Sequence, residues 1–414
     1  MSAAGGRVLA TLTPAERRVS LVAILASIFV ATLTFAMSTP LLALRLEAAG
    51  VSGLWMGLNT ATESAAILIF TLATPSFTRR VGTARALYAA VAVMTLGVAL
   101  LPVFPSLFAW FLLRFLMGAG VAVLWVVGET WMNTIADDAT RGRTSGLYVA
   151  AMSAAYCLGF PILIATGTEG VAPFVVMTAT IAATAIPLCL ARRLIPELGQ
   201  VDAGGFGTLF RREPAIMAAA LANGVIIGIV LAFFAIYVGR VGAKPELALF
   251  MLFVIAAGNV VLQLPVGMLA DRHEGEPLLA AVAVFSIAGF VALPLVLDCA
   301  LLRWPLLFFW GGLIGAAYTI ALAMLGRRYA TGELAAANAL FAFVYEAGTL
   351  VGPLATGAAL DIWSPHGFLA VGVVANLLFL AVVILRGRRV GASFARAPMA
   401  PAPAPVVEPK RPEG

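Results

Sequence analysis

Four ionisable side chains lie inside long apolar stretches of the sequence. They are Glu63, Arg114, Glu129 and Glu346. If these stretches cross a membrane, placing each charge there costs roughly 2.5 to 3.5 kcal/mol or more, so each is a functional candidate. These four residues are therefore the first place to look for chemistry.

Two of the carboxyl groups, Glu63 and Glu346, lie near the middle of their apolar stretches. A carboxyl group removed from water favours its protonated form, and a second carboxylate nearby strengthens that preference. Such a group can bind a proton in one conformation and release it in another. The alternative is a local structural role, with Glu63 hydrogen-bonded to Asn59 and Glu346 to Tyr345 or Asn338.

Arg114 and Glu129 share one stretch and one helix face with Gly118, Val121 and Trp125, within an arc of about 80°. The same helical geometry separates Arg114 from Glu129 by about 22 Å along the axis, so they cannot pair with each other. For Glu129 we expect a gating ion pair, with contact to a solute as the alternative. Its candidate partners are Arg79, Arg80, Arg85, Arg141 and Arg143.

The elements that position these residues are predicted to be membrane-spanning helices. Of the 414 residues, 62% are apolar and 11% charged, against about 45–50% and about 25% in soluble domains; the mean hydropathy is +1.02. At about 20 residues per span, twelve runs qualify: 19–44, 54–76, 84–104, 106–132, 145–167, 171–191, 214–239, 247–270, 278–297, 304–325, 335–358 and 366–386.

The basic residues predict orientation. Most Lys and Arg residues fall in the terminal segments and in every second loop, whereas the other loops hold only Arg45, Arg240, Lys244 and Arg303. By the positive-inside rule, both termini are expected in the cytoplasm. The expected location of the chain is the inner (plasma) membrane of a bacterium. Because the cations lie in gaps between apolar runs, the net charge of +6 does not indicate nucleic-acid binding.

The chain divides into two similar halves. We expect a cytoplasmic segment at 1–18, six-helix bundles at 19–191 and 214–389, a cytoplasmic linker at 192–213 and a disordered cytoplasmic tail at 390–414. Three glycine pairs recur at an offset of about 193 residues: Gly82 with Gly275, Gly118 with Gly311, and Gly159 with Gly352. A duplicated bundle is typical of transporters that rock two halves around a central site.

Several short motifs resemble known sequences. "GMLADR", Gly267 to Arg272, resembles a signature of the major facilitator superfamily, although the equivalent first-half segment "PSFTRRVGTAR" carries Arg79 where that family has Asp. "LLRFLMGAG" around Arg114 resembles the arginine signature of the same superfamily. "LWVVGETWMN", "RGRTSGLY" and "NALFAFVYEAGTLVGP" resemble its YcaD-like branch.

This resemblance implies an all-α membrane protein of twelve helices in two pseudo-symmetric six-helix bundles, the major facilitator fold. It implies that the second and eleventh spans pack together, so that Glu63 and Glu346 could meet at a moving interface. Arg114 would handle protons or an anion, with a structural hydrogen-bond hub as the alternative. The implied gate comprises Gly267, Asp271, Arg272, Glu129, Arg79 and Arg80.

The resemblance also implies where a solute binds, because the first, fourth, seventh and tenth spans line the central cavity of that fold. The aromatic candidates there are Trp125, Phe233, Phe234, Tyr237, Trp310 and Tyr318. Such a lining favours an amphipathic solute over a sugar or a phosphate. The alternative for each residue is packing or interfacial anchoring.

The expected function is secondary active transport of a small organic solute, coupled to protons, by a monomer without cofactor or metal. No phosphate-binding motif of the G-x-x-x-x-G-K-[ST] type occurs. The cysteines Cys157, Cys189 and Cys299 lack metal-ligand spacing. An intramembrane enzyme is disfavoured because His273 and His366, the two histidines, fall in loops. A solute receptor on the same fold is the remaining alternative.

Overall fold

The computed structural model describes residues 13–135, 141–196, 206–329 and 331–396, and within these ranges every regular element is a helix. Twelve candidate membrane spans lie in the described part, which confirms the predicted all-α membrane fold. The helices are α2 (Pro14–Ala48), α3 (Gly53–Val81), α4 (Thr83–Leu100), α5 (Leu107–Ile135), α6 (Arg141–Thr166), α7 (Ala172–Ala183), α8 (Ala185–Leu190), α9 (Phe206–Arg212), α10 (Pro214–Arg240), α11 (Pro245–Arg272), α12 (Gly275–Val296), α13 (Ala300–Ile314), α14 (Ala316–Arg328), α15 (Thr331–Ile362) and α16 (Gly367–Arg396).

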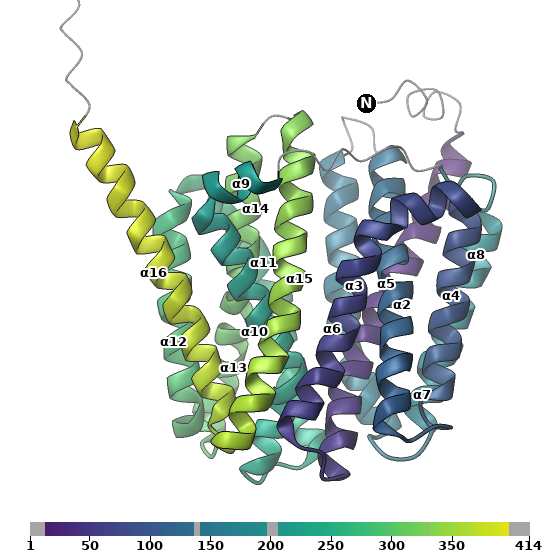
Figure 1. Ribbon diagram of the computed structural model, residues 1–414, viewed down its shortest axis with the longest axis horizontal. Helices are drawn as coiled ribbons and strands as arrows, with labels where there is room; N and C mark the ends of the chain where they lie inside the picture. Colours follow the sequence, from purple (N-terminus) through teal and green to yellow (C-terminus); the bar gives the residue numbers. More distant parts are fainter. Residues whose placement is uncertain (1–12, 136–140, 197–205, 330, 397–414) are drawn as a thin grey trace, which may run out of the picture.

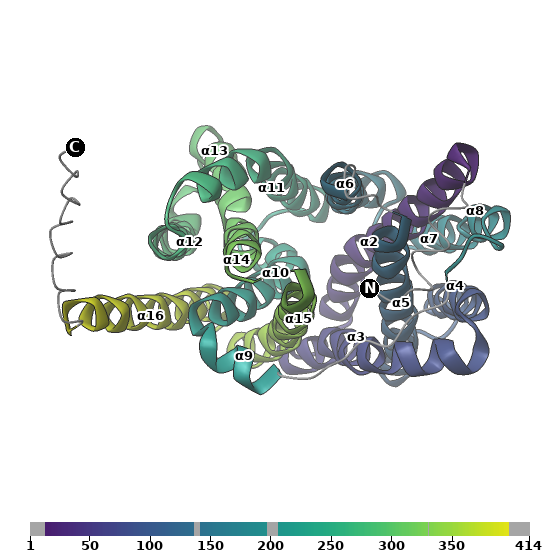
Figure 2. The same ribbon diagram turned by 90° about the horizontal axis from the view of Figure 1, so that it is seen from above.

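The helices form two bundles that lie side by side, α2–α8 and α10–α16 (Figures 1 and 2). Three helix pairs join the bundles: α3 with α15, α6 with α11 and α2 with α10. We call the end where α2 and α10 begin and α16 ends the terminal face. The opposite face carries the connections 49–52 and 241–244.

Two of the three recurring glycine pairs, Gly118 with Gly311 and Gly159 with Gly352, make equivalent contacts in the two bundles, whereas Gly82 and Gly275 do not. At Gly118 of α5 a Cβ atom would strike the backbone carbonyl of Glu63 in α3, and at Gly311 of α13 it would strike Ile255 in α11. In each bundle the fourth span therefore approaches the second span closely because one residue has no side chain. The sequence repeat thus reflects a repeated packing arrangement.

The helices differ from the predicted runs in two places. The runs at 171–191 and 304–325 are each divided, the first between α7 and α8 at Thr184 and the second between α13 and α14 at Gly315. At Gly315 the side-chain amide of Asn259 occupies the space that a Cβ atom would need. A hydrophobicity pattern records burial in lipid and carries no signal for such a local break.

Helices also extend into segments predicted to be linkers or tails. α2 begins at Pro14, where Thr13 and Glu16 form a capping box, so that the hydroxyl and carboxylate satisfy backbone N–H groups at the helix start. α9 lies in the expected linker, and α16 continues to Arg396, past the expected start of the tail. The rest of that tail, 397–414, lies outside the described residues.

Candidate functional site

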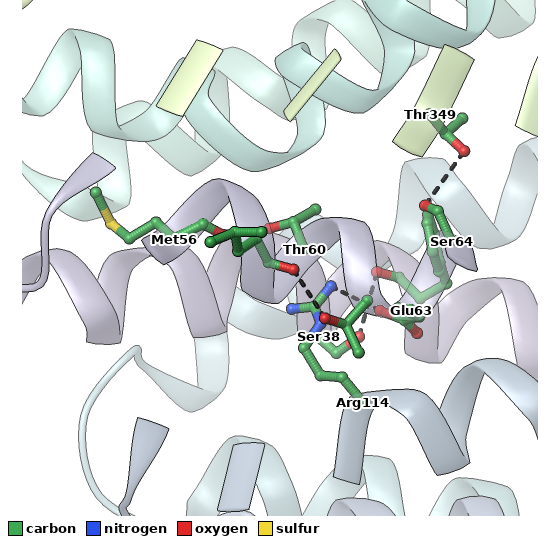
Figure 3. A network of polar contacts seen from close by, with 10 residues as sticks. Ser38, Met56, Thr60, Glu63, Ser64, Arg114 and Thr349 are labelled. Atoms are coloured by element: carbon green, nitrogen blue, oxygen red, sulfur yellow. Dashed lines mark hydrogen bonds and ion pairs between the residues drawn. The ribbon is translucent and has the colours of Figure 1, made fainter. Parts of the chain in front are cut away.

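The candidate site begins with an ion pair between α3 and α5. Arg114 Nη2 donates to Glu63 Oε2 at 2.6 Å, and both side chains are only 1% exposed (Figure 3). The pair forms because Gly118, one turn after Arg114, allows α5 to lie directly against the backbone of Glu63. The partner that Arg114 requires is therefore Glu63.

Polar atoms around this pair remain without recorded partners in the described part of the chain. These are Nε and Nη1 of Arg114 and both side-chain atoms of Asn59. Asn59 lies one turn before Glu63 on α3 and is fully buried. The alternative of a Glu63–Asn59 hydrogen bond is not recorded among the described residues. Buried donors without partners are costly, and they leave hydrogen-bonding capacity beside the pair.

A second polar contact crosses from one bundle to the other. Thr349 Oγ1 of α15 lies 3.2 Å from Ser64 Oγ of α3 (Figure 3). The same hydroxyl donates to Glu346 Oε2 at 2.9 Å. Ser64 follows Glu63 in sequence, so Thr349 connects the surroundings of the two carboxylates. Glu346 is also within electrostatic range of Glu63, and the two residues do lie at one inter-bundle interface.

Glu129 has different surroundings. The side chain of Glu129 has a solvent-accessible surface. Most of its surroundings are nevertheless protein atoms rather than bulk water. No hydrogen bond or ion pair is recorded for it among the described residues. Tyr148 of α6 and Tyr318 of α14 lie within electrostatic range of it. The expected ion pair with Arg79, Arg80 or Arg85 is not recorded in this conformation, and the side chains of Arg141 and Arg143 lie outside the described residues.

Aromatic side chains from both bundles lie around these carboxylates. In the first bundle the ring centroid of Phe35 is 6.3 Å from that of Trp125 and 6.4 Å from that of Tyr156. In the second, Tyr318 is 5.4 Å from Tyr345. All five residues are partly exposed. We call Trp125, Tyr156, Tyr318, Tyr345, Glu129 and Glu346 the central cluster.

The two bundles meet across this cluster. Tyr156 lies within electrostatic range of Glu346 and Tyr345, and Tyr318 lies within range of Glu129. The structure therefore brings Trp125 and Tyr318, both predicted as solute contacts, into one region. The other four predicted aromatic contacts are fully buried in the core: Phe233, Phe234, Tyr237 and Trp310. Three of them pack on aromatic rings of the second bundle, Phe234 and Tyr237 on Phe368 and Trp310 on Phe290.

The gate residues predicted within the two motif segments, "GMLADR" and "PSFTRRVGTAR", lie near the terminal face. Asp271 and Arg272 are exposed at the end of α11, and no partner is recorded for either within the described ranges. Arg80 is likewise exposed, while Arg79 donates to Ser76 Oγ on its own helix at 2.9 Å. Gly267 is loosely packed, since its Cβ atom would reach only Thr319. Among the described residues, no hydrogen bond or ion pair from these residues to the other bundle is recorded in this conformation.

Contacts that sequence reasoning missed connect the bundles at the opposite face. Arg240 at the end of α10 binds both carboxylate oxygens of Glu47 in α2, at 2.7 and 2.8 Å. Asp361 in α15 accepts hydrogen bonds from the backbone N–H groups of Gly53 and Leu54, at 2.6 and 2.9 Å. The aspartate thus caps the start of α3 from the other bundle.

The sequence contains signals for two of the observed ion pairs, Glu47–Arg240 and Glu63–Arg114. Glu47 and Arg240 are separated by the offset of the glycine repeat, 193 residues, so opposite charges occupy equivalent positions in the two halves. Positions related by a pseudo-two-fold axis meet when they lie close to that axis. Glu63 and Arg114 lie at similar depth from the opposite face, because α3 and α5 both begin there.

These features define a multi-pass membrane protein whose two bundles enclose a polar and aromatic centre. A family model for the Major Facilitator Superfamily matches residues 24–322. The chain belongs to this family of membrane transporters.

Relatives and solved structures agree with this assignment. The uncharacterised MFS-type transporter YcaD of Escherichia coli O7:K1 (strain IAI39 / ExPEC) is 25% identical over 365 residues, which cover 87% of this chain and 94% of the relative. The resemblance to YcaD is thereby confirmed. The nucleoside transporter NupG superposes with a TM-score of 0.70 at 12% identity, covering 89% of this chain and 98% of NupG.

Two further solved structures have the same fold. A bacterial homologue of the lysosomal transporter Spinster, in an inward-facing and unoccupied conformation, has a TM-score of 0.70 at 14% identity, covering 94% of this chain and all of the other. A D-xylose–proton symporter has a TM-score of 0.64 at 14% identity, covering 87% and 96%. At these identities the likeness concerns the fold alone.

Proposed function

We propose that this protein is a secondary active transporter that moves a small amphipathic organic solute across the bacterial inner membrane, driven by protons. The terminal face is assigned to the cytoplasm, since the described opposite face carries only the cations Arg45, Arg240, Lys244 and Arg303. Because polar contacts join the bundles at that opposite face, this conformation is assigned as the one closed toward the outside.

The observation that carries the proposal is the position of Glu346 at a contact that alternating access must break. Ser64 and Thr349 belong to different bundles, so rocking the bundles apart at the opposite face separates them. That motion also changes the distance from Glu346 to Glu63 and to water. A proton that binds Glu346 more tightly in one conformation than in the other shifts the equilibrium between them.

Arg114 plays a supporting part in this mechanism. It holds Glu63 in a charge-neutral pair within the first bundle, so the pair can move with that bundle as a unit. Glu346, whose carboxylate accepts a hydrogen bond only from Thr349 in the described part of the chain, carries the exchangeable proton.

The test uses the purified protein in proteoliposomes under an imposed pH gradient, with a mixed solute library analysed by mass spectrometry. We expect one or more solutes to move with the gradient. Glu346→Gln should abolish accumulation driven by the gradient but keep exchange of labelled for unlabelled solute, because exchange needs no net proton movement. Asp298→Asn, on the exposed opposite-face connection between α12 and α13, is the matched control. Undiminished accumulation by Glu346→Gln contradicts the coupling role.

A further inference from the structure

The central cluster combines aromatic faces with acidic groups in one accessible region. Its aromatic members come from four helices and both bundles: Trp125 of α5, Tyr156 of α6, Tyr318 of α14 and Tyr345 of α15. Each is partly exposed although it lies within a membrane span. Aromatic rings placed only to fill a core are normally covered, as Phe233 and Trp310 are here at 0% exposure.

The charge within this region is negative. The cation described within the adjoining spans, Arg114, is already paired with Glu63. Glu129 has no recorded partner, and Glu346 receives one hydrogen bond from Thr349. Two carboxylates therefore remain without a cation among the described residues of the region.

Glu129 and Glu346 are placed for different tasks. Glu346 lies beside the Ser64–Thr349 contact and moves relative to Glu63 when the bundles rock. Glu129 lies on α5, away from that contact, and its exposed carboxylate is near Tyr148 and Tyr318. A carboxylate that is accessible, enclosed and without a partner favours a cation brought by the solute itself.

We infer that the central cluster binds an amphipathic organic cation as the transported solute, with Glu129 opposite its positive charge and the rings of Trp125, Tyr156 and Tyr318 against its apolar body. This inference rests on the proposed transport function and adds the substrate class. A cation over an aromatic face is attracted by the negative charge of the ring face, and the carboxylates reject anions by like-charge repulsion.

The test compares two probes of the same shape and opposite charge, radiolabelled tetraphenylphosphonium and tetraphenylborate. Binding to the full-length protein, immobilised in detergent, is measured without any gradient, and binding to protein-free beads in the same detergent is subtracted. We expect saturable binding of the phosphonium and none of the borate. Equal or tighter binding of the borate overturns the inference.

Variants test whether the carboxylate of Glu129 and the ring of Tyr318 contribute to phosphonium binding. Glu129→Gln should weaken phosphonium binding about tenfold or more, whereas Glu129→Asp should retain most of it. Tyr318→Ala should weaken binding and Tyr318→Phe should preserve it, because the ring and not the hydroxyl makes the contact. Glu274→Gln, exposed at the terminal face, is the control. Thermal unfolding midpoints within a few degrees of the parent establish that each variant is folded, and parent-like binding by folded Glu129→Gln overturns the inference.

The result is separable from the test of transport. Phosphonium binding without gradient-driven movement of any solute supports the cation site and contradicts proton-driven transport. Gradient-driven movement of an anionic or neutral solute, with no phosphonium binding, supports transport and overturns the cation site.

Discussion

At the scale of single residues, the Glu63–Arg114 pair is the most constrained feature of the interior. Both groups are almost completely buried, and two nitrogen atoms of Arg114 have no recorded partner in the described part. A buried pair contributes little net stability because desolvation offsets the attraction, but removing one partner leaves an uncompensated charge. The pair is therefore a requirement of the fold around the site.

Glu63→Gln should destabilise the protein by about 3 to 5 kcal/mol, because it leaves Arg114 charged and buried. The double variant Glu63→Gln with Arg114→Gln should be more stable than Glu63→Gln alone, since no unpaired charge remains. Glu346→Gln, which leaves no cation behind, is the control and should change stability little. The measurement is thermal unfolding in detergent, and additive effects of the two single substitutions would contradict the pairing.

The sequence identified all four interior charges and their depths, but it did not identify their partners. Helical periodicity fixes the depth and the direction of a side chain on its own helix. It does not say which neighbouring helix lies there, so the sequence leaves Asn59 and Glu346 as candidate neighbours of Glu63 and names no particular partner for Arg114. Similarly, it could not distinguish Tyr318, which is partly exposed, from Trp310, which is buried in the core.

At the scale of helices, α3 and α15 form the principal contact between the bundles. Small residues allow it: a Cβ atom at Gly53 would lie 3.2 Å from the carbonyl carbon of Gly357 and 2.9 Å from the carboxylate of Asp361. Asp361 then caps α3. The contact is close and polar at the opposite face, where it would have to open during transport.

Asp361→Ala should shift the conformational equilibrium toward a form open at the opposite face. The lost cap is worth about 1 kcal/mol, which corresponds to a population change of about fivefold. Spin labels at positions 85 and 274, both exposed near the terminal face, should then report a larger short-distance population, in a background with the three cysteines replaced by serine.

Asp298→Asn in the same labelled background is the control, because that exposed carboxylate has no recorded partner. An unchanged distance distribution in Asp361→Ala would mean that the cap does not hold the opposite face closed. Glu47 and Arg240 are only partly buried, with side chains 29% and 23% exposed, so breaking that pair alone should have the smaller effect.

Span number, helix type and approximate boundaries followed from the sequence because burial in lipid imposes long apolar runs. The breaks at Thr184 and Gly315 did not, because the hydrophobicity continues through both; at Gly315 the side chain of Asn259 on a neighbouring helix occupies the space beside the break. The inter-bundle contacts of Asp361 could not be predicted either, because the residue lies at a helix end, where carboxylates are common.

At the scale of the whole molecule, orientation decides how the conformation is interpreted. The bundles meet through Glu47–Arg240 and the Asp361 cap at the opposite face, whereas no inter-bundle ion pair is recorded at the terminal face within the described ranges. If the terminal face is cytoplasmic, these contacts close the outer side of the protein. In the reverse orientation the same contacts would close the cytoplasmic side.

The charges predict the first of these orientations, and paired reporter fusions test it. Alkaline phosphatase, which is active only outside the cytoplasm, should be inactive when fused after residue 414 and active when fused to a chain truncated after Gly242, which lies on the opposite face. Green fluorescent protein at the same two sites should show the reverse pattern. Lys and Arg residues disfavour the side outside the cytoplasm. Lys244→Glu removes a cation from that side, so it should leave this topology unchanged. An active phosphatase after residue 414 would reverse the orientation and place the terminal face, with Glu129 near it, on the outer side of the membrane.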